Sequence, residues 1–331
     1  MDDDDRTREE TPADPGEVFL TAEAACHHDV AGLHRERFAG LPLKALHEVD
    51  DPSERVAWAL CGESGPGHDE AGSTLANELD RLLESVDPAR VEALAVLTDG
   101  AGTAAELAAN AHRLPALRSV FLGLIEAEHW EISWIRQGDI TPLLQAYPRL
   151  ERLDVRGSDG LTLSAVTHEH LRVLRFECGG LPGAVVRAVG ASAFPALEHL
   201  ELWLGVESYG GDHTIADLDG ILAGARLPAL KRLGLRNSEQ QDEVAAAVAA
   251  APVLARLEAL SLGMGVLSDR GAEALLSGQP LSHLSVLDLN HHFLSDAMTD
   301  RVRRALPGVA VDLGDRQPTE PHGWRYTAVS E

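Results

Sequence analysis

The sequence contains few of the residues that would indicate disulfide, zinc or nucleic-acid chemistry. Its 331 residues include only three cysteines, Cys26, Cys61 and Cys178, which are far apart and form no CxxC pair. This spacing excludes a disulfide framework and a zinc signature. Lysine occurs only at Lys44 and Lys231, and the formal net charge is −25. A surface of that sign repels nucleic acid and anionic lipid, so we expect neither as a partner.

Long hydrophobic runs are missing as well. No apolar stretch approaches the roughly 20 residues that span a bilayer, so we expect no membrane partner. The first ten residues, MDDDDRTREE, have no apolar core of the kind found in signal peptides. The expected location is therefore the cytoplasm. Aromatic residues make up 4% of the chain and hydrophobic residues 44%, so the core should be mainly aliphatic.

The sequence repeats itself instead. LEALSLGMGVLSDRG begins at Leu257, and LSVLDLNHHFLSDAM begins 27 residues later, at Leu284. The same spacing of leucines recurs upstream in LKRLGL, LEHLEL, LRVLRF, LERLDV and LRSVFL, and more weakly in VEALAV. Alanine-rich stretches with helical periodicity separate the copies. Each copy predicts a short strand followed by a helix, and stacking the copies buries their apolar faces against one another.

This pattern resembles the leucine-rich repeat in its long, ribonuclease-inhibitor-like form, over about residues 90–313. The resemblance implies an α/β solenoid, a horseshoe with a concave parallel β-sheet and convex helices. From about Phe38 onward, segments such as EISWIRQGDITPLL, LELWLGVESYGGD and RYTAVSE are similar to an uncharacterised bacterial family of leucine-rich-repeat proteins. That similarity implies a cytoplasmic bacterial repeat protein and carries over no reaction.

The chain is expected to have four parts. Residues 1–35 form an acidic, mostly disordered N-terminal arm, and residues 36–90 form an N-terminal cap with a strand pair, a strand and a helix. Residues 91–313 form the solenoid, and residues 314–331 form a C-terminal cap or tail. The alternative for the N-terminal residues is a separate domain.

The concave face is the surface on which we expect binding. In each copy the leucines point into the core, and the alternate positions point outward in three rows that run across the sheet. The predicted binding residues are Arg152, Asp154, Arg156, Arg175, Glu177, His199, Glu201, Trp203, Arg232, Arg236 and Tyr209. The middle four copies have a local excess of two positive charges. Ion-pair ladders within rows could satisfy some charges, but Arg152, Arg232 and Arg236 have no obvious partner in their own rows.

These residues favour a non-catalytic protein–protein interaction module that binds an acidic segment of a protein partner. Arginine and tryptophan are the residue types that dominate interface hot spots. The alternative is an enzyme or enzyme subunit that acts on a small anionic substrate at the same patch, with Glu177, His199 and Glu201 as acid–base groups. No nucleophile, metal or cofactor motif is present, so no cofactor is expected. A third hypothesis is a homo-oligomeric scaffold that associates through its convex helices.

Other short features also permit more than one interpretation. Residues 263–265, Gly-Met-Gly, follow a strand as a phosphate-binding loop would, but the equivalent copy has Asn-His-His there. The glycines are therefore predicted to be turn residues, with Ser268 and Ser295 capping the helices that follow. Trp130 and Trp134 lie in an insertion after the first full copy and fit either a core wedge or a binding surface.

Overall fold

The computed structural model describes residues 19, 37–49, 51, 53–60, 75–125, 131–318 and 323–330. Trp130, and all residues of the predicted N-terminal arm except Phe19, lie outside the described residues. The strands are β1 (Arg37–Phe38), β2 (Leu41–Ala45), β3 (Ala57–Leu60), β4 (Ala93–Val96), β5 (Ser119–Leu122), β6 (Arg152–Arg156), β7 (Val173–Glu177), β8 (His199–Gly205), β9 (Arg232–Ser238), β10 (Ala259–Ser261), β11 (Val286–Asp288) and β12 (Ala310–Asp312).

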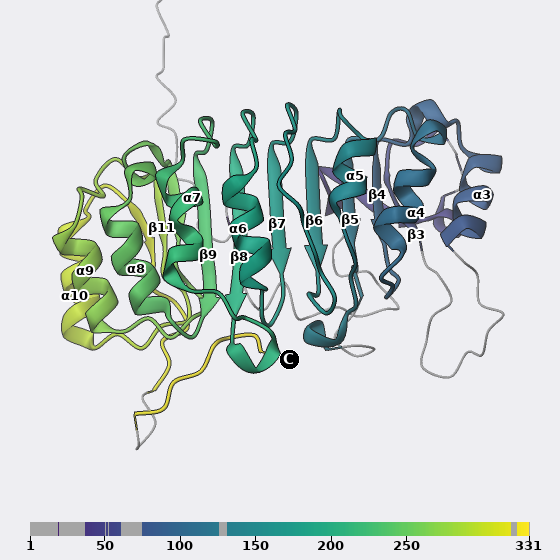
Figure 1. The fold of residues 1–331 in the computed structure, drawn as a ribbon. Coiled ribbons are helices and arrows are strands. Elements are labelled where there is room, and N and C mark those ends of the chain that lie inside the picture. The colour runs from purple at the N-terminus through teal and green to yellow at the C-terminus, as the bar shows by residue number, and fades with distance from the viewer. Residues whose placement is uncertain are drawn as a thin grey trace, which may run out of the picture.

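All of these strands belong to one sheet, whose spatial order from β1 to β12 is the order of the sequence. β1 and β2 are antiparallel, and every later pair is parallel. Parallel neighbours need a crossover connection, which the segment between successive strands provides. The predicted α/β class and parallel sheet are confirmed, and the sequential order is compatible with a repeat solenoid (Figure 1).

The helices in the described part of the chain lie along one face of the sheet (Figure 1). They are α3 (Leu75–Ser85), α4 (Thr103–Ala109), α5 (Thr141–Ala146), α6 (Gly183–Ala191), α7 (Asp219–Ala223), α8 (Gln241–Ala250), α9 (Asp269–Ser277) and α10 (Asp296–Ala305). Among the described residues, no helix has the length and apolarity needed to cross a membrane.

The repeated leucines form the layer between the sheet and the helices. Leu153, Leu174 and Leu200 are completely buried in one continuous aliphatic core with residues such as Val186 of α6 and Val244 of α8. Neighbouring copies share this core, because a single strand and helix could not cover the apolar face of either element. The residues between the leucines therefore point to the opposite face of the sheet, as the pattern predicts.

The turn that ends each copy explains the Gly-Met-Gly segment. Met264 has a φ of 69°, and His291, at the equivalent position one repeat later, has a φ of 56°. The same left-handed backbone is therefore built from two different residues, so the segment is a structural turn of the repeat. The predicted caps are confirmed: the Ser268 hydroxyl accepts a hydrogen bond from the Arg270 N–H, and the Ser295 hydroxyl accepts one from the Met298 N–H.

The C-terminal residues 323–330 run past the ends of β8, β9 and β10. The Asn237 side chain donates to the carbonyl oxygen of Val329 at 2.5 Å and accepts from the Val329 N–H at 3.0 Å. The Ser133 hydroxyl donates to the Ser330 carbonyl oxygen at 2.6 Å. Val329 also packs in a small buried cluster with Trp203 and Ile132. The C-terminal segment therefore covers a tryptophan that the sequence placed on the binding surface.

Candidate functional site

The sheet face opposite the helices carries the predicted binding residues. We call it the helix-free face; across β6–β11 it consists of residues 152, 154 and 156 of β6 and the residues aligned with them on the neighbouring strands. The first row aligns Arg152, Val173, His199, Arg232, Ala259 and Val286, and the second aligns Asp154, Arg175, Glu201, Gly234, Ser261 and Asp288. The predicted register is confirmed in both rows.

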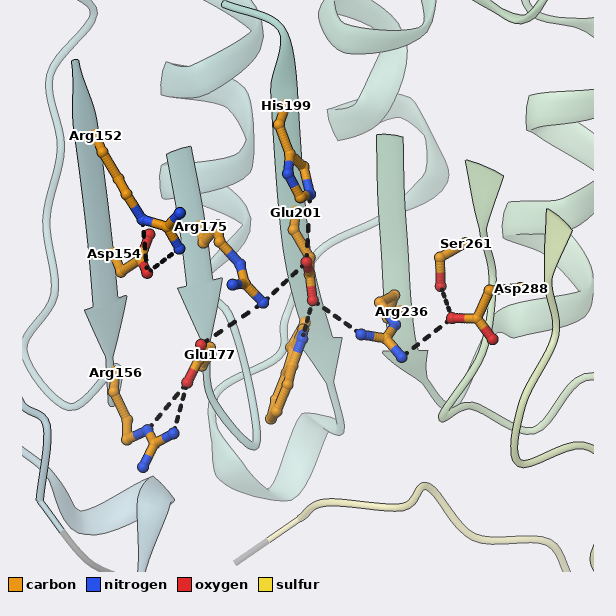
Figure 2. A network of polar contacts seen from close by, with 11 residues as sticks. Arg152, Asp154, Arg156, Arg175, Glu177, His199, Glu201, Arg236, Ser261 and Asp288 are labelled. Carbon is orange, nitrogen blue, oxygen red and sulfur yellow. Dashed lines mark hydrogen bonds and ion pairs between the residues drawn. The ribbon is translucent and has the colours of Figure 1, made fainter. Parts of the chain in front are cut away.

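Glu201 of β8 lies at the centre of a buried network on this face (Figure 2). One carboxylate oxygen lies 3.0 Å from an Arg175 guanidinium nitrogen, and the other lies 2.9 Å from an Arg236 guanidinium nitrogen. The Trp203 indole N–H donates to the same carboxylate at 3.0 Å. His199 Nε2 lies 3.4 Å from it. One carboxylate thus organises groups from three adjacent strands.

Arg236 reaches two carboxylates because the position beside it has no side chain. Its guanidinium contacts Glu201 on β8 and, at 3.2 Å, Asp288 on β11. Gly234 lies in the row between these two acids. A Cβ atom on Gly234 would lie 3.0 Å from Glu201 Cγ and 3.3 Å from Arg236 Cδ. Asp288 also accepts a hydrogen bond from the Ser261 hydroxyl at 2.6 Å. The network therefore extends over four strands, from Glu201 on β8 to Asp288 on β11.

The N-terminal end of the network has its own ion pairs. Arg156 of β6 binds Glu177 of β7 through two nitrogens, at 2.7 and 3.1 Å from one oxygen. Arg152 binds Asp154, two residues along its own strand, at 2.8 Å. Arg152 and Arg236 therefore pair with acids in a different row. A comparison of residues only within rows does not predict these pairs.

Burial and neighbouring charge together set the protonation of the network. Burial alone would raise the pKa of Glu201, but Arg175 and Arg236 beside it lower that pKa well below its ordinary value. Burial lowers the pKa of His199, although Glu201 opposes this shift. Burial raises the pKa of Asp288, and Arg236 opposes that shift. At neutral pH, Glu201 is therefore ionised and His199 is neutral.

The expectation that these residues form an accessible patch needs correction. Eight of the eleven predicted residues are buried: Asp154, Arg156, Arg175, Glu177, His199, Glu201, Trp203 and Arg236. With Asp288 included, the face carries five arginines and four acids, so its excess is one positive charge. Arg232 is the exposed arginine of the set and forms no ion pair with another described residue. Most of the predicted site is thus a structural network, with Arg232 at its accessible edge.

Aromatic rings lie against this network. The Arg152 guanidinium lies 5.3 Å from the ring centre of Phe38, and that of Arg156 lies 5.7 Å from the ring centre of Phe121. At the other end, the Arg236 guanidinium lies 5.9 Å from the ring centre of Phe19. These distances are within the range of cation–π contacts. Phe121 aligns with Asp154 in the second row, whereas Phe19 and Phe38 precede the repeats, so the repeat pattern gives them no such role.

Tyr209 lies away from the network, in a shallow groove of about 500 Å³ at the C-terminal ends of β5–β8. Trp134, which is 58% exposed, lines the same groove with Asp159 and Gly180. The exposure of Trp134 excludes the interpretation of this residue as a core wedge. Tyr209 and the network residues therefore do not form one site.

His291 and His292, which are adjacent in the sequence, have structural partners. His291 contacts Asp315 at 3.1 Å and the carbonyl oxygen of Tyr326 at 3.0 Å, and His292 contacts the carbonyl oxygen of Leu313 at 3.2 Å. Within the described residues, no cluster of histidine, cysteine and acidic side chains could hold a metal ion. Cys178 is buried, and burial raises the pKa of its thiol to about 12, so it is a poor nucleophile.

The buried histidines predict a loss of stability in mild acid. Burial lowers the pKa below the usual 6.5 at four of them: His168, His199, His213 and His292. The unfolded chain therefore binds more protons, so the free energy of unfolding should fall as the pH drops below about 6.5. Urea denaturation at about pH 7.5 and 5.5 measures this change. The His199→Gln chain should lose less stability over the same range, and equal losses in both chains would contradict the assignment to His199.

Comparisons with known proteins support the fold and assign no activity. No protein-family model matches the sequence, and no curated protein matches it. Among solved structures, the crystal structure of a protein from Bacteroides fragilis is similar, with 29% sequence identity and a TM-score of 0.69. The similarity covers 76% of this chain and 72% of that chain.

Proposed function

We propose that this chain is a leucine-rich-repeat protein of the ribonuclease-inhibitor-like form and that its helix-free face is the concave side of a horseshoe. The repeated spacing of leucines, the sequential parallel sheet and the single layer of helices support this assignment. Such solenoids present an extended surface formed by many copies, and that surface commonly serves for binding.

The proposed function is non-catalytic binding of a protein partner through an acidic segment. The proposal rests on a difference in exposure and pairing between Arg232 and the other arginines of the helix-free face. The four others form ion pairs with buried carboxylates of the network. Arg232 is exposed in the same sheet, beside Ala259 and His199. An exposed cation that has no ion-pair partner among the described residues, next to an apolar and an aromatic side chain, suits a partner that offers a carboxylate.

The same geometry disfavours acid–base catalysis at the network. Glu201 is held ionised by two arginines, so it is a poor proton donor at neutral pH. Glu177 is bound by Arg156 through two nitrogens and is completely buried. A catalytic carboxyl group needs access to substrate and a pKa near the working pH. We therefore favour the binding module over the enzyme.

The test is quantitative capture of partners from the native cell by three tagged chains: wild type, Arg232→Glu and Arg304→Glu. Arg304 is also exposed but lies on α10, on the helical side of the sheet. The Arg232→Glu change should reduce recovery of the specific partner by at least about tenfold, because a like charge now faces the acidic segment. Arg304→Glu should leave recovery unchanged. Equal recovery by all three chains would refute the assignment of the binding face.

A further inference from the structure

Phe19 lies on the helix-free face, against strands near the C-terminal end of the sheet. Its side chain is 2% exposed and packs with Ala259 of β10 and Val286 of β11. Ala310 of β12 adds a partly buried apolar contact. These three small or branched residues continue the first row beyond Arg232. They leave room above the sheet for one aromatic ring.

Polar groups complete the walls of this pocket in a way that suits an aromatic side chain. The His199 ring meets the Phe19 ring edge to face, with 5.6 Å between the ring centres and an interplanar angle of 90°. The Arg236 guanidinium lies 5.9 Å from the ring centre, and Glu201 and Asp288 fix its position. The buried network therefore holds both polar walls of the pocket in place.

The sequence around Phe19 has the chemistry that we propose for the partner. Residues 9–24, EETPADPGEVFLTAEA, contain five acidic residues and no lysine, arginine or histidine. We infer that the pocket of His199, Arg236, Ala259 and Val286 recognises an aromatic residue within an acidic segment, and that Phe19 occupies it as an internal competitor. This inference rests on the proposed function and adds the identity of the anchoring side chain.

An internal competitor changes how a partner binds. The arm is attached to the same chain, so Phe19 is present near the pocket at a high effective concentration. A partner segment must displace Phe19 before its own aromatic residue enters. Removal of the Phe19 ring should therefore strengthen binding of an external acidic segment without any change in the pocket.

The test uses two fluorescent peptides of residues 9–24, one with Phe19 and one with Phe19→Ala, and two full-length chains, wild type and Phe19→Ala. The Phe19 peptide should bind the Phe19→Ala chain at least about tenfold more tightly than the wild-type chain, because the internal competitor is absent. The Phe19→Ala peptide should bind either chain at least about tenfold more weakly than the Phe19 peptide binds the Phe19→Ala chain.

Two controls keep the result specific to the pocket. A far-UV circular dichroism spectrum like that of the wild-type chain, and a cooperative melting transition above the assay temperature, establish that the Phe19→Ala chain is folded. Its melting temperature should be lower than that of the wild type, because Phe19 is buried. An Ala259→Leu change in the Phe19→Ala chain fills the pocket and should remove the preference for the Phe19 peptide. Equal binding of both peptides, or no binding to the Phe19→Ala chain, overturns the inference. Capture that depends on Arg232 would then still support the proposed function, so the two failures are distinguishable.

Discussion

Replacing Glu201 by alanine is expected to lower the free energy of unfolding by about 3–5 kcal/mol. The change removes a carboxylate that lies within 3.0 Å of both Arg175 and Arg236. Both guanidinium groups are buried, and without Glu201 they would lose a large part of the negative charge that compensates for desolvation. The Trp203 indole N–H would also lose its hydrogen-bond acceptor. Urea denaturation of the wild-type and Glu201→Ala chains at neutral pH measures the difference.

Glu198 provides the matched control for this prediction. It pairs with Arg172 at 2.7 Å, but both side chains are substantially exposed. Exposed ion pairs contribute about 0–1 kcal/mol, so Glu198→Ala should change stability by no more than that. Similar losses in the two variants would show that burial of the network does not set its energetic importance.

Gly205→Ala is the second large expected effect, with a loss of at least about 3 kcal/mol from backbone strain and overpacking combined. Gly205 ends β8 with a φ of 71°, in the left-handed region that favours glycine. A Cβ atom there would lie 1.9 Å from the Gly179 carbonyl oxygen and 2.5 Å from Gly180 Cα. The backbone of the preceding copy would have to move to accept the methyl group, which would disturb the bridge between Gly180 and Gly205. Thermal and urea denaturation measure the loss.

Gly308→Ala is the control for the glycine prediction. A Cβ atom on Gly308 would have no heavy atom within 4 Å, and the φ of Gly308 is not positive. Its replacement should change the free energy of unfolding by less than about 1 kcal/mol, and it can be stabilising because alanine restricts the unfolded chain. A loss at Gly308 as large as that at Gly205 would contradict the steric explanation.

The regular part of the fold could be predicted because its physical cause is periodic. Leucines such as Leu257 and Leu284 mark equivalent strands, so the spacing alone predicted that Ala259 pairs with Val286 and Ser261 with Asp288. The caps Ser268 and Ser295 followed from the same frame. Each of these features depends on contacts between neighbouring copies, which a repeat in the sequence makes visible.

The irregular contacts could not be predicted in the same way. Arg236 reaches Asp288 two strands away because Gly234 leaves space and the arginine side chain is long, and neither condition is visible in a row-by-row comparison. Phe19 and Val329 come from opposite ends of the sequence and cover parts of the predicted surface. Contacts of this range have no periodic signal, so the burial of Trp203 and Arg236 followed only from the fold.

Site-specific photo-crosslinking identifies the face of the sheet that contacts the partner. A benzoylphenylalanine in place of Val173, a partly exposed residue in the same row as Arg232, leaves Arg232 intact. This variant, and a separate one at Arg304 on α10, report which side of the sheet contacts the partner inside the native cell. If the helix-free face binds the partner, position 173 should yield a crosslinked partner and position 304 should yield none. A crosslinked partner from position 304 alone would place the interaction on the helical side and contradict the account.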